Sequence, residues 1–332
     1  MRKLVLYMVA VALLQGCHVR NENIMQIEEQ GSFAVGGTVL TDSLGHNYHG
    51  DHAYVFYQKS VDARKYPLVF AHGVGQFSKT WETTPDGREG FQNIFLRRGF
   101  STYIVDQPRR GNAGRSTEAT TISPAFDEET WFNRFRIGIY PDYFEDVQFC
   151  RSKEALDQFF RQMTPDTGMD NAAGDQSIDN AVVAQAVAAA IDEIYERTGQ
   201  DSILVTHSQG GLPGWEVPLY TDHVAAIVAI EPGGAPEVDS DAYSAMVEQN
   251  IPVTFYYGDY IGEEFTDVPA AMWSMMAASA DTFTEAYNAA GGSSTVVHLP
   301  DEGITGNDHF MFQDLNNDVI ADHIEAWIQE NV

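Results

Sequence analysis

Cysteine is scarce in this chain of 332 residues, which contains only Cys17 and Cys150. A fold held together by several disulfide bonds is therefore excluded. If Cys17 is chemically modified, as its neighbours indicate below, Cys150 is the last free thiol and no disulfide can form within the chain. Stability must then come from a buried apolar core, where we expect Cys150 to be a structural residue rather than a nucleophile.

Positive charge is scarce as well. The chain has 19 lysine and arginine residues against 48 aspartate and glutamate residues, which gives a formal net charge of −29. Nucleic acids and anionic membrane surfaces repel such a charge, so neither is expected as a partner. The length suits one large α/β domain with insertions better than two equal domains.

Long apolar runs are missing from most of the chain. No segment after the N-terminus is apolar over the length needed to cross a bilayer. Leu4–Leu14 is apolar but too short to span a membrane, and it directly follows Arg2 and Lys3. A basic start followed by a short apolar stretch is typical of an export signal.

The end of that stretch, Leu14-Gln15-Gly16-Cys17, resembles the lipobox of bacterial lipoprotein signals. The resemblance implies cleavage before Cys17 and acylation of its thiol, so residues 1–16 are predicted to be a signal peptide and residues 17–30 a polar tether. The mature protein would be an exported lipoprotein, facing the periplasm or anchored in the outer membrane, and attached to the membrane through its lipid only. A plain secretory signal, which gives a periplasmic or secreted protein, is the alternative.

Strand patterns begin at Gly31. Three short ones, separated by Gly, Asp and Asn turns, predict an antiparallel edge. Apolar strands then alternate with amphipathic helices, which predicts a single α/β domain over residues 31–332 with a mostly parallel sheet and helices on both faces. The predicted strands are 33–35, 38–40, 52–57, 67–71, 101–105, 203–206, 224–230, 253–257 and 295–299, and the predicted helices include 91–98, 177–197 and a last one around Ile324.

Two segments interrupt this alternation. Residues 116–174 are too long for a simple connection and carry aromatic clusters around Trp131, Tyr143 and Phe149. We expect a structured insertion that covers the sheet, a cap. Residues 262–292 form the second segment, which carries methionines and a tryptophan on a predicted helix.

A strand-like run leads into Thr206-His207-Ser208-Gln209-Gly210. A small residue two positions before a serine and a glycine two positions after it are typical of a nucleophile elbow, in which a strained turn from strand to helix exposes the serine hydroxyl. The flanking residues must be small because strand and helix cross closely there. Gly210 meets this requirement, whereas Thr206 stands where glycine is usual. Ser208 is the predicted nucleophile.

A serine hydroxyl is a weak nucleophile near neutral pH, so Ser208 needs a base, an acid behind the base, and donors for the oxyanion. In this kind of sheet the acid and the histidine follow the serine in the chain. Three later histidines precede the last predicted helix, namely His223, His298 and His309. His223 precedes a predicted strand and His298 lies within one, whereas His309 lies in a loop between the last strand and the last helix. We therefore predict His309 as the base.

Two carboxylates compete for the position behind the base. Asp259 follows the predicted strand 253–257, the commonest place for this acid, and Glu231 follows the strand 224–230. A carboxylate at the end of a buried strand is costly without a partner, which the histidine would supply. The extra methylene of glutamate allows it to reach across from the neighbouring strand. The residues alone leave both candidates open.

The oxyanion hole is expected from backbone amides. One belongs to Gln209, directly after the nucleophile, and the other to the loop after the strand 67–71. Gly73 allows this loop to turn its amides inward, which makes the N–H of Val74 the predicted second donor. His72 is expected to brace the loop rather than to act as a base.

The remaining polar clusters are interpreted structurally. Arg109, Arg110, Arg134 and Arg136 could bind an acidic substrate, but in so acidic a chain they are expected to form local ion pairs. No lysine-bearing phosphate loop accompanies the glycines near Gly111, and no spacing of His, Cys and carboxylates indicates a metal site. We predict no cofactor and no metal.

With these residues placed, longer strings resemble the Alcaligenes-type bacterial esterases, a small branch of the α/β-hydrolase superfamily. The resemblance runs from about Leu68 to Val332. After His72-Gly73, the pair Val74-Gly75 departs from the pattern of this branch, which concerns the shape of the pocket more than the backbone amides. The similar strings are Thr80–Arg88, Gly99–Gln107, Pro141-Asp142 with Asp146 and Gln148-Phe149, Ile230–Gly233, Gly258–Phe265 and Gly306–His309.

The resemblance implies an α/β-hydrolase fold with Ser208 as nucleophile, His309 as base and a glutamate after the sixth strand, which here is Glu231 and not Asp259. The implied activity is hydrolysis of small-molecule carboxylic esters through an acyl-enzyme. Two alternatives stay open: the same residues acting on thioester, lactone or amide bonds, and a catalytically silent lipoprotein that uses the fold for binding. A homodimer also stays open.

Overall fold

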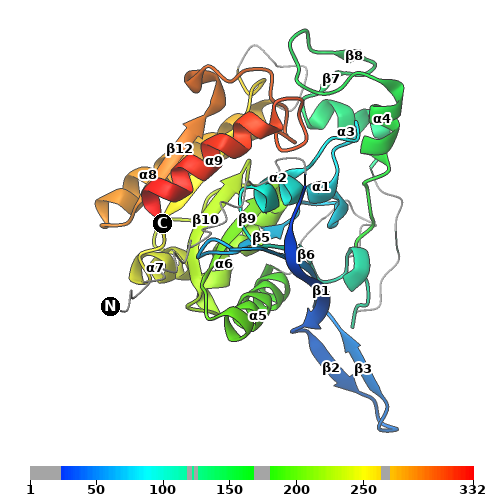
Figure 1. The fold of residues 1–332 in the computed structure, drawn as a ribbon, viewed down its shortest axis with the longest axis vertical. Coiled ribbons are helices and arrows are strands. Elements are labelled where there is room, and N and C mark those ends of the chain that lie inside the picture. Colours follow the sequence, from blue (N-terminus) through cyan, green and yellow to red (C-terminus); the bar gives the residue numbers. More distant parts are fainter. Residues whose placement is uncertain (1–23, 118–121, 123–125, 168–179, 263–269) are drawn as a thin grey trace, which may run out of the picture.

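The computed structural model describes residues 24–117, 122, 126–167, 180–262 and 270–332. Within these residues an eight-stranded sheet has the order β1-β4-β6-β5-β9-β10-β11-β12 (Figure 1). From β6 to β12 all neighbours are parallel, whereas β4 is antiparallel to both β1 and β6. The predicted mostly parallel sheet with an antiparallel N-terminal edge is confirmed. Its strands are β1 (Ile27–Val35), β4 (Ala53–Ser60), β5 (Leu68–Ala71), β6 (Thr102–Asp106), β9 (Ser202–His207), β10 (Val224–Ile230), β11 (Val253–Tyr257) and β12 (Ser294–His298).

Successive side chains of each strand point to opposite faces of the sheet, so the sheet has one apolar core on each face, and helices cover both. Leu68 and Phe70 of β5 belong to the first core, and Val69 and Ala71 to the second. The first core packs under α1, α2 and α9, and the second under α5, α6, α7 and the second half of α8. Across the described ranges, no helix has the length and apolar character needed to cross a membrane. The bounds are α1 (Lys79–Glu82), α2 (Phe91–Arg97), α5 (Asn180–Thr198), α6 (Gly211–Glu216), α7 (Asp241–Glu248), α8 (Ala270–Ala289) and α9 (Asn317–Asn331).

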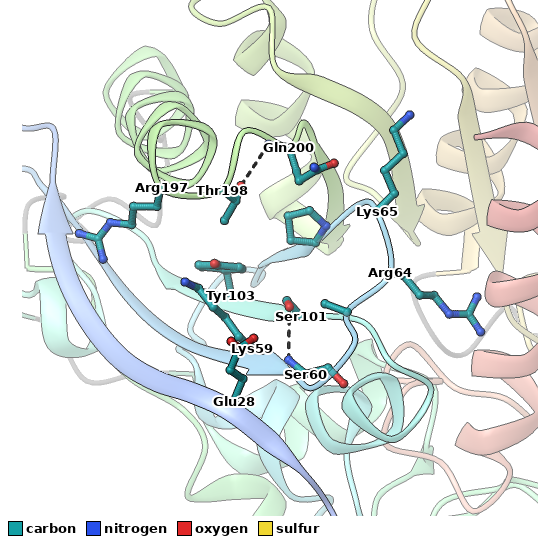
Figure 2. Close-up of a pocket in the computed structure, with 12 residues that line it drawn as sticks. Glu28, Lys59, Ser60, Arg64, Lys65, Ser101, Tyr103, Arg197, Thr198 and Gln200 are labelled. Atoms are coloured by element: carbon teal, nitrogen blue, oxygen red, sulfur yellow. Dashed lines mark hydrogen bonds between the residues drawn. The ribbon is translucent and has the colours of Figure 1, made fainter. Parts of the chain in front are cut away.

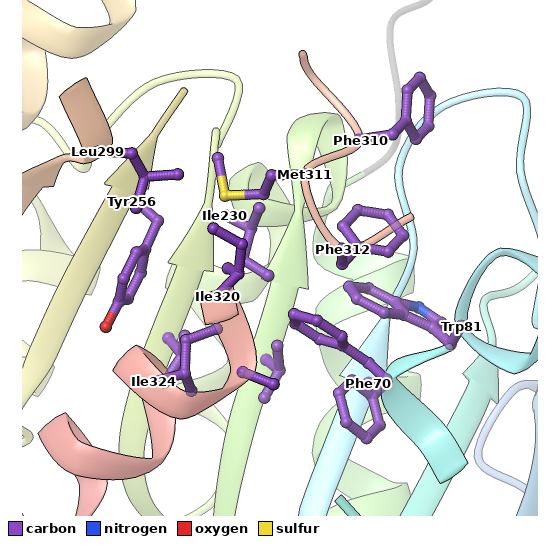
Figure 3. Close-up of a cluster of buried hydrophobic side chains, with 14 of the residues drawn as sticks. Phe70, Trp81, Ile230, Tyr256, Leu299, Phe310, Met311, Phe312, Ile320 and Ile324 are labelled. Carbon is purple, nitrogen blue, oxygen red and sulfur yellow. The ribbon is translucent and has the colours of Figure 1, made fainter. Parts of the chain in front are cut away.

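Part of the first core lies directly beneath the loop that carries His309 (Figure 3). Phe310, Met311 and Phe312 follow His309 in the chain and are buried. The ring of Phe312 stacks on that of Trp81 with the centroids 4.3 Å apart. Because three consecutive side chains of the loop belong to the core, the core holds the loop backbone in place next to the imidazole.

The N-terminal edge begins earlier than predicted. The residues up to Gln30 are predicted to be a tether, but β1 already starts at Ile27 and pairs with β4. Glu29 of β1 accepts a hydrogen bond from Tyr57 Oη at 2.5 Å and pairs with Lys59 Nζ at 2.8 Å. Residues 27–30 therefore belong to the sheet and not to the predicted tether. The sequence did not indicate this, because a polar edge strand shows no apolar periodicity. The predicted signal peptide and Cys17 lie outside the described residues.

A second polar strand, β3 (Asn47–Gly50), was also not predicted from the sequence. β2 (Thr38–Thr41) was expected, and it forms an antiparallel hairpin with β3. The hairpin projects away from the body of the protein (Figure 1). Most of its side chains face solvent, so pairing between backbones is its main source of order.

The insertion predicted over residues 116–174 is structured in its described part. Its aromatic side chains join the first core, as expected for a segment that packs over the sheet. Cys150, which we expected to be buried, is only partly buried. The insertion contains α3 (Glu128–Arg134), the short hairpin of β7 (Gly138–Ile139) and β8 (Asp142–Tyr143), and α4 (Lys153–Phe160).

Candidate active site

The carboxyl ends of β5, β9 and β10 lie side by side because these strands are parallel neighbours. Ile230, the last residue of β10, pairs with His207, the last of β9, and Ala71, the last of β5, pairs with Thr206, one residue earlier in β9. The next residues in the chain, His72, Ser208 and Glu231, therefore start from the same edge of the sheet. The strand order alone brings together three of the segments that the sequence singled out.

Ser208 has the backbone geometry predicted for a nucleophile elbow. It begins the short helix η3 (Ser208–Gly210) between β9 and α6, and its φ is 55°. A left-handed φ is strained for any residue other than glycine, typically by about 1–3 kcal/mol. Gly210 has no room for a side chain, because a Cβ there would lie 2.2 Å from the carbonyl oxygen of His72. The turn is therefore held tightly against the loop after β5.

The unusual Thr206 is accommodated by a glycine on the facing helix. A Cβ added to Gly214 of α6 would lie 2.7 Å from Cγ2 of Thr206, closer than real Cβ atoms approach another heavy atom. The side chain of Thr206 thus occupies the space that a residue other than glycine at position 214 would fill. The strand and helix still cross closely, because the small residue needed at the crossing is Gly214 of the helix and not residue 206 of the strand.

His309 and Glu231 form a buried pair. Nδ1 of His309 lies 2.7 Å from Oε2 of Glu231, and both side chains are fully buried. The backbone N–H of Gly258 donates a hydrogen bond to Oε1 of Glu231 at 2.7 Å. The N–H of His309 donates to the carbonyl oxygen of Phe135 at 3.1 Å, which ties the loop to the insertion. Of the two carboxylates left open by the residues alone, Glu231 is the one that contacts the histidine.

The other candidates are engaged elsewhere. The carboxylate of Asp259 accepts hydrogen bonds from the N–H groups of Tyr260 and Gly306, at 2.8 and 3.1 Å. Asp259 therefore orders the backbone of the turn that leads to His309, whereas Glu231 contacts the imidazole ring. His223 pairs with Asp201 at 2.9 Å, and His298 lies 3.8 Å from a carboxylate oxygen of Asp281.

The loop after β5 lies against the elbow. A Cβ added to Gly73 would come within 2.8 Å of the Cβ of Ser208. His72 braces this loop as expected: its Nε2 accepts a hydrogen bond from the N–H of Gln107 at 3.2 Å, so its Nδ1 donates to the carbonyl oxygen of Gly73 at 3.0 Å. Burial lowers the pKa of His72 to about 4, which keeps the ring neutral. The segment that contains Val74 therefore lies next to Ser208, and Gln209 follows Ser208 directly, so both predicted donors belong to segments that adjoin the elbow.

Comparison with known proteins shows the family to which the chain belongs. Residues 68–329 match the alpha/beta hydrolase family. The chain belongs to this family. It is similar to the solved structure of a novel bacterial esterase, with 31% sequence identity and a TM-score of 0.79, over 93% of this chain and 97% of the esterase chain. It is also 27% identical to a probable secreted lipase, phiG, of Fungal sp. (strain ATCC 74256), over 80% of this chain and 82% of the lipase.

This alpha/beta hydrolase has one site residue that sequence reasoning missed. Arg136 was expected to form a local ion pair, but its Nη2 contacts Oε1 of Glu231, which lies 95 positions away in the sequence. Both side chains are fully buried. Nε of Arg136 donates to the carbonyl oxygen of Asp259 at 2.9 Å, and the guanidinium lies 4.9 Å from the ring centre of Trp273. A positive φ of 65° at Arg136 is the local sign of a constrained position, and it is visible only in the structure.

These contacts set the charges of the buried pair. Burial raises the pKa of Glu231, but the charge of Arg136 and the hydrogen bond from His309 outweigh it and leave the pKa at about 2. Burial lowers the pKa of His309 to about 4, and Arg136 acts in the same direction, while Glu231 opposes both. At neutral pH the pair is therefore a carboxylate and a neutral imidazole. Its Nδ1–H donates to Glu231, so the lone pair is on Nε2, which has no hydrogen-bond partner among the described residues.

Aromatic rings pack on the imidazole of His309. Phe135, from the insertion, is nearly parallel to it, with an interplanar angle of 11° and the centroids 4.7 Å apart. Trp273 of α8 lies at 4.2 Å, and His207 of β9 at 4.5 Å. These rings exclude water from the buried pair and limit the orientations of the imidazole. Both segments that interrupt the strand–helix alternation thus contribute to the site.

A separate pocket of about 160 Å³ lies at the opposite end of the strands (Figure 2). It is lined by Pro67 before β5 and Ser101 before β6, together with several basic side chains. Three of those side chains are already in ion pairs: Lys59 with Glu29, Arg64 with Glu325 and Arg197 with Glu193. Ser208, Glu231 and His309 do not line this pocket, so it is distinct from the candidate active site.

Proposed function

We propose that the protein is a serine esterase of the Alcaligenes-type branch of the alpha/beta hydrolase family, and that it hydrolyses carboxylic esters of small molecules. Ser208 is the nucleophile, His309 the base and Glu231 the acid of the triad. The observation that carries the proposal is the buried contact of 2.7 Å between His309 Nδ1 and Glu231 Oε2, at the edge where Ser208 has its strained backbone. The relatives described as an esterase and a lipase support an ester bond as the target.

The mechanism follows from the protonation states of the pair. Nε2 of His309 accepts the proton of Ser208 while Oγ attacks the ester carbonyl carbon, and the Glu231 carboxylate stabilises the imidazolium. The N–H groups of Val74 and Gln209 donate to the oxyanion of the tetrahedral intermediate. The intermediate collapses, His309 gives its proton to the departing alcohol, and an acyl-enzyme remains. Water then attacks the acyl-enzyme, with His309 again as base, and Ser208 is restored.

The site also accounts for a glutamate in the place of the usual aspartate. Glu231 starts from β10, next to the strand of the nucleophile, and its longer side chain spans the gap to His309. Arg136 and the N–H of Gly258 hold Oε1, so that Oε2 is left for the imidazole. A glutamate with only one of these partners would have more rotamers open to it, and the geometry of His309 would be less well defined.

We further propose that the protein is exported as a lipoprotein, with its lipid on Cys17. The lipobox-like string Leu14-Gln15-Gly16-Cys17 and the relative described as a secreted lipase support export. The lipid would attach the enzyme to a membrane without a spanning helix.

The first prediction concerns the nucleophile. Ser208→Ala is expected to lower kcat on p-nitrophenyl esters by about 10³-fold or more, because the attacking oxygen is lost while binding remains. Short, medium and long acyl chains should be assayed in parallel with amide, thioester and lactone substrates. Ser202→Ala is the matched control, since Ser202 is buried at the other end of the same strand. Equal rates for Ser208→Ala and the unmodified protein would rule out the assignment.

The second prediction separates the two carboxylates. Glu231→Gln is expected to lower kcat by about 10²–10⁴-fold, because an amide supports the wrong tautomer of His309 and no longer balances Arg136. Asp259→Asn is expected to lower it by less than about 10-fold, because Asp259 only orders a turn. Steady-state kinetics of both variants, with circular dichroism as a check of folding, test this. A larger loss for Asp259→Asn would show that the acid is Asp259.

The third prediction is a pH profile. The base must be neutral, so kcat/KM falls as pH drops through the pKa of His309, which lies at about 4. Activity is therefore expected to persist through the range in which an ordinary histidine, with a pKa of about 6.5, becomes protonated. In Arg136→Met the cation that lowers this pKa is gone, so the acid limb is expected to move to higher pH.

Two controls belong to this profile. Arg134→Met removes an arginine whose guanidinium lies over the ring of Phe126, and it should leave the acid limb in place. Asp308→Asn removes the neighbouring carboxyl group, whose pKa burial raises to about 7, and identifies any part of the profile that belongs to it. An acid limb that is unchanged in folded Arg136→Met would contradict the assigned electrostatics.

The fourth prediction concerns the lipid. When the full chain is expressed in a bacterium, it should incorporate labelled palmitate and partition with the membrane fraction. Cys17→Ser should abolish the label, whereas the matched variant Cys150→Ser should keep it. Label that persists in Cys17→Ser, or none in the unmodified chain, would contradict the lipoprotein proposal.

A further inference from the structure

Arg110 is buried beside the candidate active site but plays no part in the triad. It follows β6, and only 2% of it is exposed. A buried guanidinium must be paired, and its Nε donates to the carboxylate of Asp166 at 3.1 Å. The ion pair expected from the sequence is therefore present. It accounts for one edge of the guanidinium only, since Nη1 points to different partners.

Nη1 of Arg110 lies among three acceptors. It is 3.1 Å from Oε1 of Gln107, 3.1 Å from Oε1 of Gln209 and 3.4 Å from the carbonyl oxygen of Gly73. Gln209 follows the nucleophile, and Gly73 precedes Val74. One nitrogen thus contacts both segments that are proposed to supply the oxyanion donors.

The contact with Gly73 fixes the direction of the Val74 N–H. The carbonyl of Gly73 and the N–H of Val74 belong to one planar peptide, and in a trans peptide they point in opposite directions. Among the described residues the cis peptide is Tyr140-Pro141, so this one is trans. Donors that hold the oxygen of Gly73 therefore orient the Val74 N–H away from Arg110. His72 Nδ1, at 3.0 Å, is the second donor to the same oxygen.

This loop needs such anchors because of its composition. Two of its four residues, His72 to Gly75, are glycines, and Gly75 has a φ of 63°. Glycine leaves a backbone free to take several conformations, so the sequence alone would not hold the peptide in one of them. Two further carbonyls of the loop are also held: that of His72 accepts from Nε2 of Gln107 at 2.6 Å, and that of Gly75 accepts from the N–H of Thr164 at 2.9 Å.

The charge of Arg110 adds to this geometric effect. A cation next to the carbonyl oxygen draws electron density through the peptide and makes its N–H a stronger donor. The effect is largest where water is excluded, as it is around a residue with so little exposed surface. The gain appears when negative charge develops on the substrate oxygen, and not when the neutral ester binds.

We propose that Arg110 is a positioning residue of the oxyanion hole, which orients and polarises the Gly73–Val74 peptide and fixes the segment of Gln209. The proposal rests on the proposed esterase function, in which the Val74 and Gln209 amides bind the oxyanion. Arg110 itself does not touch the substrate.

The test compares two adjacent arginines. Arg109 and Arg110 are both buried and both pair with an aspartate, Arg109 with Asp51 at 2.9 Å, and Nη1 of Arg110 contacts Gly73 and Gln209 in addition. Arg110→Met is expected to lower kcat by about 10–100-fold with KM changed less than about 3-fold, because a weakened oxyanion donor acts on the transition state. Arg109→Met, the matched control, should lower the melting temperature and leave kcat within about 3-fold.

A second readout separates positioning from general damage. A boronic acid or trifluoromethyl ketone that forms a tetrahedral adduct with Ser208 should bind Arg110→Met more weakly by the same factor that kcat/KM loses. Arg110→Lys keeps the charge without the planar guanidinium, so its kcat and adduct affinity should lie between those of Arg110→Met and the unmodified protein. If Arg110→Met does not fold, Arg110→Lys is the variant that tests the proposal. Unchanged kcat and adduct affinity in a folded Arg110 variant, or equal losses in Arg109→Met, would overturn the proposal. If Ser208→Ala is as active as the unmodified protein, the esterase function itself fails, whatever the arginines do.

Discussion

The buried carboxylate of Glu231 is the constraint on which the site depends. An unpaired charge in this position would cost several kcal/mol, and removing one partner of a buried ion pair typically costs about 3–5 kcal/mol. Glu231 avoids that cost through three partners: the guanidinium of Arg136, the N–H of Gly258 and the imidazole of His309. These come from the insertion, the turn after β11 and the loop before α9. Four distant parts of the chain therefore meet at one charged group.

The same network shows how the proposed acid, Glu231, is compatible with the family fold. Asp259, which stands where the acid is commoner, binds the backbone of the turn that leads to His309. Arg136 reaches both ends of this arrangement, since it contacts the carboxylate of Glu231 and the carbonyl oxygen of Asp259. The insertion is thus more than a cover over the sheet. It supplies the cation that keeps Glu231 ionised and, through Phe135, a ring that packs on the imidazole.

Close packing around the elbow imposes a second set of constraints. Gly73 and Gly210 have no room for side chains, and Gly214 makes room for Thr206. Steric demand here belongs to a pair of positions rather than to one of them. Thr206, in a place usually taken by glycine, is tolerated because residue 214 of the facing helix is a glycine and has no side chain at the point of contact. A motif read one position at a time therefore underestimates how well this sequence suits the turn.

The sequence by itself determined the features that rest on short-range patterns. The parallel strands were predictable because buried strands are apolar runs bounded by turns, and Ser208 because the elbow is written in five consecutive residues. His309 could be singled out because only one later histidine lies in a suitable loop. Polar strands were not predicted from the sequence. β3 shows no apolar periodicity, and β1 extends into residues that were predicted to be a tether. Most of their side chains face solvent, and their order comes from backbone pairing.

Only the tertiary structure decided which distant groups meet. From the residues alone Glu231 and Asp259 were equal, because the choice depends on side-chain reach between strands. Arg136 and Arg110 were expected only to form local ion pairs until their partners were known. The sequence pattern does not show which charged side chains become neighbours, and the effect of a charge depends on distances of a few ångströms in the folded protein. The composition and local order thus specified the sheet and the predicted nucleophile, and long-range packing specified the charges around them.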